Sequence, residues 1–104
     1  MKNVVFLLVA VSMILACAAI GVAADAAHGK EVYAAQKCQM CHAIAGAGNK
    51  KYPLDGVGTK LTPDKIKSWI TEPKKMDPKT TMPAKASIPA KDLEDLVEYL
   101  STLK

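Results

Sequence analysis

Apolar residues along this 104-residue chain form one long run near the start, followed by shorter segments with helical spacing. Residues 4–24 contain no charged side chain. Farther on, residues 26–36, 63–72 and 89–102 are predicted to be helices. The clearest apolar stripe belongs to the last of these, at Leu93, Leu96, Val97, Leu100 and Leu103. The opposite, polar face of this helix is expected to carry its carboxylates, which are Asp92, Glu94, Asp95 and Glu98. Because no stretch has the strict alternation of a strand, the pattern predicts an all-α fold with about three main helices.

Local signals mark the ends of the middle predicted helix. Thr62 is a good helix N-cap, and Pro63 suits the first helical position. Pro73 ends this helix because the residue before a proline avoids helical backbone angles. In the first predicted helix, Gly29 costs about 1 kcal/mol relative to alanine. Such a glycine is typical of a position that another helix approaches closely.

The predicted connections are long for so small a domain. Residues 43–58 are rich in glycine and residues 73–89 contain four prolines, so both are predicted to be loops. The whole of residues 25–104 holds only four aromatic side chains. A chain of this length rarely stabilises itself with a peptide core alone, and long loops need something to hold them. A disulfide, a metal or a cofactor is therefore expected.

The first residues have the organisation of a secretory signal peptide. Lys2 gives a positive start, an apolar run follows, and small residues precede Asp25. We therefore expect residues 1–24 to be cleaved and residues 25–104 to form the functional domain. Two alternatives remain open: the run could stay as a membrane anchor, or Cys17 could be lipidated. All three alternatives place the domain outside the cytoplasm, and the expected compartment is the periplasm.

The charged residues exclude one class of partner. All 14 basic residues are lysine, against 10 acidic residues. The planar guanidinium of arginine, which is favoured for recognising phosphates and base edges, is absent from the sequence. The sequence also lacks the dense basic stripe with stacking aromatics that is typical of nucleic-acid binders. We therefore expect no nucleic-acid partner.

The chemistry of the chain is concentrated in the segment Cys38-Gln39-Met40-Cys41-His42. The spacing C-x-x-C-H is the attachment motif of c-type haem. The two cysteines lie about one turn apart and can form thioethers with the porphyrin vinyl groups, and His42 can then supply an axial nitrogen to the iron. Three alternatives weighed against it are a redox dithiol, a simple disulfide, and a zinc site that would also need His28.

These features together resemble the small bacterial class I cytochromes c over residues 25–104. The match comprises a helix leading into C-x-x-C-H, a glycine-rich loop, a middle helix with a tryptophan, a Met-Pro loop and a last helix bearing Tyr-Leu. The resemblance implies a class I cytochrome c fold around one covalently bound haem. It also implies that the first and last helices cross, with Gly29 and Tyr99 at the close approach.

The resemblance implies a second axial ligand from the loop before the last helix. In this family the ligand is a methionine sulfur followed by proline, which Met82-Pro83 matches. Met76 and His28 remain alternatives, although His28, near the start of the first helix, is expected to point to solvent. Met40 lies inside the attachment motif and is geometrically unsuited. The alternative role of Met40 and Met76 is packing over the haem rim.

Two further residues receive roles from the same resemblance. The carbonyl of Pro53 is expected to accept the other ring N–H of the haem histidine, which would fix the imidazole. Trp69 is expected either to donate to a haem propionate or to serve as a core aromatic.

With His42 and Met82 as ligands, no coordination position would be open, and the expected function is one-electron transport rather than enzyme catalysis. The alternative is a haem-based ligand binder or sensor with an open or weakly held sixth position. Between residues 50 and 85 there are nine lysines against four acidic residues, so redox proteins are expected to dock at a lysine-rich face near the haem edge. A generally solvated lysine surface is the alternative. The protein is expected to be a monomer, associated with a membrane only if its first segment is retained.

Overall fold

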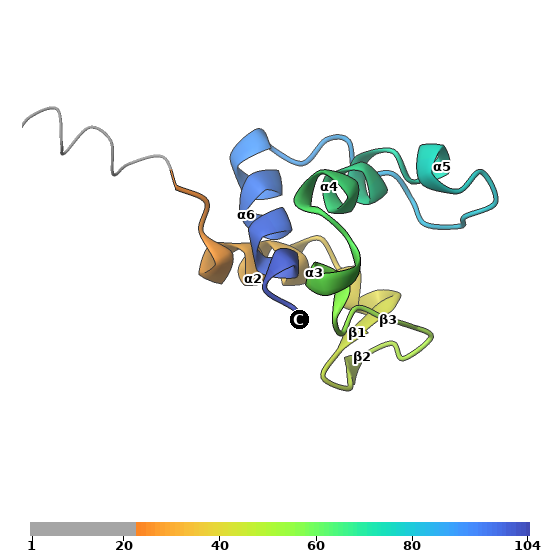
Figure 1. The fold of residues 1–104 in the computed structure, drawn as a ribbon, viewed down its shortest axis with the longest axis horizontal. Helices are drawn as coiled ribbons and strands as arrows, with labels where there is room; N and C mark the ends of the chain where they lie inside the picture. Colours follow the sequence, from red (N-terminus) through yellow and green to blue (C-terminus); the bar gives the residue numbers. More distant parts are fainter. Residues whose placement is uncertain (1–22) are drawn as a thin grey trace, which may run out of the picture.

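The computed structural model describes residues 23–104 (Figure 1). The predicted signal peptide lies outside these residues except for its last two positions. Three longer helices are α2 (Ala26–Ala35), α4 (Pro63–Thr71) and α6 (Ala90–Ser101). Short elements between them are the 3-10 helix η1 (Cys38–Met40), the strands β1 (His42–Ile44), β2 (Ala47–Gly48) and β3 (Tyr52–Pro53), and the helices α3 (Val57–Lys60) and α5 (Pro73–Met76). Within residues 23–104, no helix has the length and apolar character needed to cross a membrane.

The three predicted helices are confirmed, with their ends within a residue or two of the expected positions. Asp25 caps α2 by accepting from the His28 amide, and the Thr62 side chain caps α4 by accepting from the Lys65 amide. In α4, Pro63 occupies the first turn as predicted. The helical part of the expected fold therefore follows from local signals in the sequence.

The segment expected to be a glycine-rich loop contains a small sheet, which the all-α prediction did not include. Its strand order is β2-β1-β3, with β1 antiparallel to β2 and parallel to β3. The turn between β1 and β2 uses positive φ at Ala45 (51°) and Gly46 (81°). Strands of two or three residues leave no alternation that a sequence pattern could reveal. The proline-rich segment likewise contains one short helix, α5.

Helices α2 and α6 cross at close range, as Figure 1 shows. A Cβ atom added at Gly29 would overlap the backbone carbonyl of Asp95 and would lie 2.7 Å from Cβ of Tyr99. Beside this crossing, the rings of Tyr33 and Tyr99 meet edge to face with centroids 6.1 Å apart. The expected close approach of Gly29 and Tyr99 is therefore confirmed.

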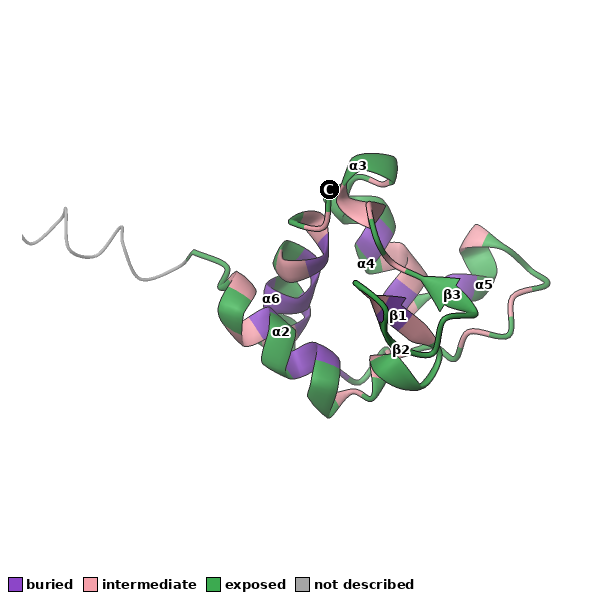
Figure 2. Ribbon diagram, turned by 90° about the horizontal axis from the view of Figure 1, so that it is seen from below, coloured by how far each residue is buried: buried purple, intermediate pink, exposed green. Residues whose placement is uncertain are grey.

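The buried face of α6 packs on α2 and α4 to form the core (Figure 2). Its buried apolar members are Val32, Tyr33, Ile66, Ile70, Ile88, Leu93, Leu96, Val97 and Leu100. The expectation that Asp95 lies on the polar outer face of this helix is wrong, because Asp95 is only 1% exposed. It faces the start of α2, where three donors reach its carboxylate.

Gly29→Ala is expected to destabilise the protein by about 3 kcal/mol, because the added methyl group meets backbone rather than a movable side chain. The exposed neighbour Ala27 provides a matched control on the same helix. Ala27→Gly should cost only about 1 kcal/mol, from helix propensity. Denaturant unfolding followed by circular dichroism measures both changes. Equal losses for the two variants would contradict a close helix crossing.

Candidate functional site

The two cysteines of the attachment motif lie on a tight turn directly after α2. Lys37 adopts left-handed backbone angles with φ 58°, and η1 then carries the chain around so that the Cys41 amide donates to the Cys38 carbonyl at 3.2 Å. Cys38 packs against the core, whereas Cys41 is exposed. Neither is paired in a disulfide in the described part of the chain. Burial raises the pKa of the Cys38 thiol, so this thiol is protonated at neutral pH.

His42 is oriented by a backbone carbonyl. Its Nδ1 lies 2.9 Å from the carbonyl oxygen of Tyr52. Because a carbonyl can only accept, Nδ1 is the donor in this bond, and Nε2 is the ring nitrogen left to bind a metal. The site can therefore present one imidazole nitrogen in a fixed direction.

The acceptor is one residue earlier than expected. Pro53 was predicted, but the structure pairs His42 with Tyr52. The register of the parallel β1–β3 pair explains this, because it sets His42 opposite Tyr52 and Ala43 opposite Pro53. The Leu54 amide then donates to the Ala43 carbonyl at 2.8 Å and fixes that register. The prediction found the right segment but could not know the strand pairing.

Asn49 is hydrogen-bonded to the turn that carries the attachment motif, residues 38–42, a role that the sequence did not suggest. Its backbone amide donates to the carbonyls of Gln39 (3.0 Å) and His42 (3.1 Å), and its side-chain amide donates to the Met40 carbonyl at 3.0 Å. Gly48 before it has φ 107°, and a Cβ there would overlap the His42 carbonyl. The one sequence signal at this position is the pair Gly48-Asn49, which is typical of any turn and does not indicate these bonds.

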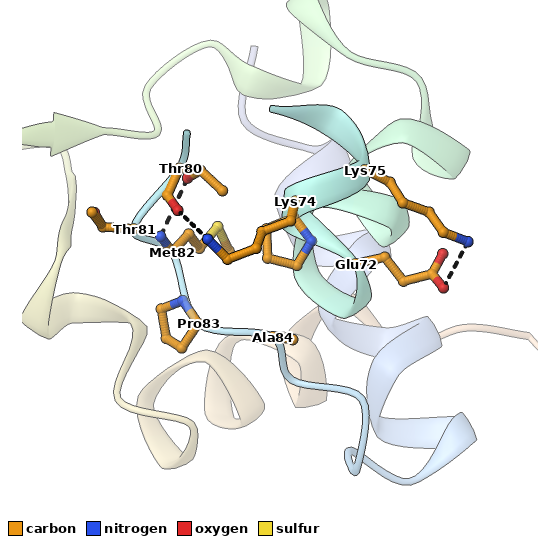
Figure 3. Close-up of a pocket in the computed structure, with 9 residues that line it drawn as sticks. Glu72, Lys74, Lys75, Thr80, Thr81, Met82, Pro83 and Ala84 are labelled. Atoms are coloured by element: carbon orange, nitrogen blue, oxygen red, sulfur yellow. Dashed lines mark hydrogen bonds and ion pairs between the residues drawn. The ribbon is translucent and has the colours of Figure 1, made fainter. Parts of the chain in front are cut away.

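Met82 lies at a pocket between α5 and the following loop (Figure 3). The pocket has a volume of about 350 Å³ and is lined by Glu72, Pro73, Lys74, Lys75, Thr80, Thr81, Met82, Pro83 and Ala84. The Met82 amide donates to the Thr80 hydroxyl at 3.2 Å, and Lys74 Nζ donates to the Thr80 carbonyl at 3.3 Å. These two bonds fix the backbone that carries the sulfur.

The remaining expected site residues lie in different surroundings. Met76 ends α5 and does not line the Met82 pocket. Trp69 is half-buried on α4, whereas Ile66 and Ile70 on the same helix are fully buried. The imidazole of His42 is bonded to the Tyr52 carbonyl of β3, whereas Met82 is bonded to Thr80 in its own loop and shares a pocket with residues of α5. The structure therefore brings His42 together with the 52–53 segment but leaves Met82 in a separate pocket.

His28 was expected to point to solvent, and this expectation is only partly right. Its side chain is 39% exposed, and its Nδ1 lies 2.8 Å from Oδ2 of Asp95. This bond to Asp95 holds the His28 side chain at the α2–α6 crossing, which argues against His28 as an axial ligand. In residues 23–104, no three histidine, cysteine or carboxylate side chains come together in a way that could hold a metal ion, which argues against the zinc alternative.

The residues present fit a covalently bound porphyrin. Within residues 23–104, the thiols of Cys38 and Cys41 are unpaired and stand one turn apart, and the neighbouring imidazole is held through Nδ1. The hydroxyl of Tyr33 is buried, and no described residue forms a hydrogen bond with it. Burial raises the pKa of Tyr33 to about 12, which keeps this hydroxyl protonated as a donor.

Comparisons with known proteins agree with this chemistry. Residues 24–100 match the protein family described as cytochrome c oxidase, cbb3-type, subunit III. The chain is also similar to a protein of Alkalihalophilus pseudofirmus named cytochrome c oxidase subunit 2, with 27% identity over 85 residues. The similarity covers 73% of this chain but 25% of that protein, so the chain spans about a quarter of its relative's length.

Proposed function

Since this chain belongs to the cbb3-type cytochrome c oxidase subunit III family and is thus a c-type cytochrome, we propose that it is a periplasmic single-electron carrier with His/Met axial ligation. In this proposal one haem is bound through Cys38 and Cys41, and the axial ligands are His42 and Met82. The observation that carries it is the bond between His42 Nδ1 and the Tyr52 carbonyl, beside two unpaired cysteines. That bond prepares an imidazole for coordination and for no other evident task.

The haem supplies a reversible change of one electron at its iron when it is bound. The contribution of the chain is to orient the ligand of the iron. The Tyr52 carbonyl holds the imidazole of His42 in one tautomer and makes it a stronger donor. Asn49 braces the turn between the cysteines and His42, so the ligand cannot swing away.

Met82 supplies the second ligand in this proposal. A thioether is a soft ligand that favours reduced iron. The Thr80 turn fixes the backbone at Met82, and Pro83 immediately after it restricts the chain further. The pocket at Met82 is also lined by the apolar residues Pro73 and Ala84. Together these features favour electron transfer over ligand binding.

The same proposal includes export of the chain and cleavage of its signal peptide after Ala24. Residues 23–25 precede α2 and are hydrogen-bonded to α6 through the Asp25 amide and the Ala23 carbonyl. Cleavage there would leave Asp25, the cap of α2, in place. The domain boundary at residues 24 and 25 is therefore compatible with an intact first helix.

The lysines of the second half of the chain support docking to an acidic redox partner. Lys74 and Lys75 line the same pocket as Met82, and the Lys75 side chain is 74% exposed. Lys79 and Lys85 lie in the loop on either side of Met82. Positive charge around an electron-transfer edge speeds encounter with a negative partner.

Electron exchange with an acidic redox protein should slow as ionic strength rises, and Lys79→Glu should slow it several-fold at low salt. Lys30→Glu on α2 makes the same change of charge elsewhere and should have little effect. Stopped-flow reduction of the haem protein measures both. A rate that is independent of salt and equal in the two variants would refute docking through this face, while loss of reversible reduction would refute the carrier function itself.

A further inference from the structure

Asp95 is a carboxylate buried at the crossing of α2 and α6. It is 1% exposed and accepts three hydrogen bonds. Lys91 Nζ lies 2.7 Å from Oδ1, the backbone nitrogen of Asp25 lies 2.8 Å from the same oxygen, and His28 Nδ1 lies 2.8 Å from Oδ2. A buried carboxylate of this kind is stable only while its partners stay in place.

The hydrogen-bond donors keep Asp95 ionised. The charged residues near Asp95 carry more negative than positive charge, so a further cation would be stabilised there. The Lys91 ammonium, followed by the Asp25 amide and by His28, lowers the pKa of Asp95 to about 2. In turn, hydrogen bonding to Asp95 raises the pKa of both Lys91 and His28. The segments 25–31 and 91–95 hold five carboxylates against two lysines and one histidine: Asp25, Glu31, Asp92, Glu94 and Asp95 against Lys30, Lys91 and His28. Negative charge therefore exceeds positive charge around Asp95.

The donor at Asp25 is the nitrogen of the peptide bond at which the signal peptide would be cleaved. Hydrolysis breaks the bond between the Ala24 carbonyl carbon and this nitrogen. The water oxygen stays with the new carboxylate of Ala24, and the nitrogen leaves as an α-amine. An α-amine has a pKa near 8, so it binds a further proton at neutral pH. Cleavage thus changes a neutral donor into a cation at the same atom.

We propose that removal of residues 1–24 creates a partly buried ion pair between the new N-terminal ammonium of Asp25 and the carboxylate of Asp95, which locks α2 onto α6. This inference rests on the proposed cleavage after Ala24. The position of the Asp25 nitrogen does not depend on residues 1–24, because two other bonds hold Asp25 in place. Its side chain accepts from the His28 amide at 3.1 Å, and its backbone carbonyl accepts from the Gly29 amide at 2.9 Å. Among the described residues, cleavage removes one hydrogen bond beside Asp95, from Lys91 Nζ to the Ala23 carbonyl, at 3.1 Å.

The test compares two exported, haem-loaded proteins. One begins at Asp25, and the other carries the extra residues Ser-Gly before Asp25, which keep an amide N–H at this position but move the charge outward. At pH 6.5 the processed protein should have an unfolding equilibrium constant about tenfold lower than that of the extended one, which corresponds to a rise of one unit in the α-amino pKa. Denaturant unfolding measures this ratio, and Asp95→Asn in both proteins should abolish it.

The pH dependence has a defined sign. A cationic group whose pKa is raised by folding stabilises the native state below its unfolded pKa, and this stabilisation disappears as pH rises through the native pKa. The tenfold difference should therefore be full below about pH 7.5 and absent well above pH 9. His28 and Lys91 bind the same carboxylate as the α-amino group, so their titration is coupled to it, and the Asp95→Asn pair of proteins is the control for all three groups. NMR titration of the α-amino group in the unsubstituted protein gives the same pKa without any variant.

Equal stability of the two proteins would overturn the inference, as would a difference that persists in Asp95→Asn or a mass spectrum in which the exported chain does not begin at Asp25. The reduction potential and optical spectrum should be the same in both proteins. A protein that lacks reversible reduction would instead count against the proposed function, so the two failures are distinguishable.

Discussion

The double variant Cys38→Ala, Cys41→Ala is expected to be exported without covalent haem and without a stable fold. The described core contains nine buried residues, and Cys38 itself packs against it. Domains as small as residues 25–104 seldom bury enough apolar surface to fold without a covalent or bound support. Loss of the thioether links should therefore remove both colour and cooperative unfolding.

Three measurements on the purified protein check this result: a pyridine haemochrome spectrum, the intact mass and far-ultraviolet circular dichroism. Met40→Ala is the matched control, because Met40 lies between the two cysteines and is 66% exposed. It should retain haem mass and helicity. A colourless double variant that remains helical and unfolds cooperatively would show that the peptide needs no cofactor, and the account of the fold would then be wrong.

Met82→Ala is expected to remove the far-red sulfur-to-iron absorption of the oxidised protein and to lower the reduction potential, by on the order of 0.1 V. The reason is that the soft thioether, which favours reduced iron, would be replaced by water or by a harder ligand. Met76→Ala is the matched control, since Met76 lies at the end of α5 and outside the Met82 pocket. It should leave both the band and the potential unchanged.

The opposite pattern, with the band lost in Met76→Ala and kept in Met82→Ala, would assign the ligand to Met76. A third result concerns the alternative function. If the unsubstituted protein lacks the band and readily binds carbon monoxide or cyanide, the sixth position is open or weakly held. The protein would then be a haem-based ligand binder or sensor rather than a carrier.

The helices were predictable because their signals are local. Thr62 and Pro63 mark the start of α4, and the stripe from Leu93 to Leu100 marks the buried face of α6. A cap or a period of 3.6 residues can be recognised without knowing what the helix packs against. The attachment motif is local in the same sense, which is why five consecutive residues are enough to predict haem attachment at Cys38, Cys41 and His42.

The features that were missed depend on pairing across the fold. The acceptor for His42 is Tyr52 rather than Pro53 because of the register between β1 and β3, which no short segment encodes. Asp95 was assigned to the outer face of its helix because carboxylates are usually exposed. Its burial becomes reasonable only once α2 brings donors to it from some seventy residues away in sequence.

The uneven distribution of lysines and carboxylates gives the molecule an electric dipole. Asp95 and the four other carboxylates of segments 25–31 and 91–95 lie on α2 and α6 or at the start of α2, whereas α5 and the loop that carries Met82 extend at the far side of the described domain (Figure 1). Such a molecule turns in the field of a negatively charged surface before it touches it, with the lysine-bearing end leading. Fewer encounters would then be wasted on unproductive orientations, and the rate of productive collision would exceed that of a molecule with the same net charge spread evenly.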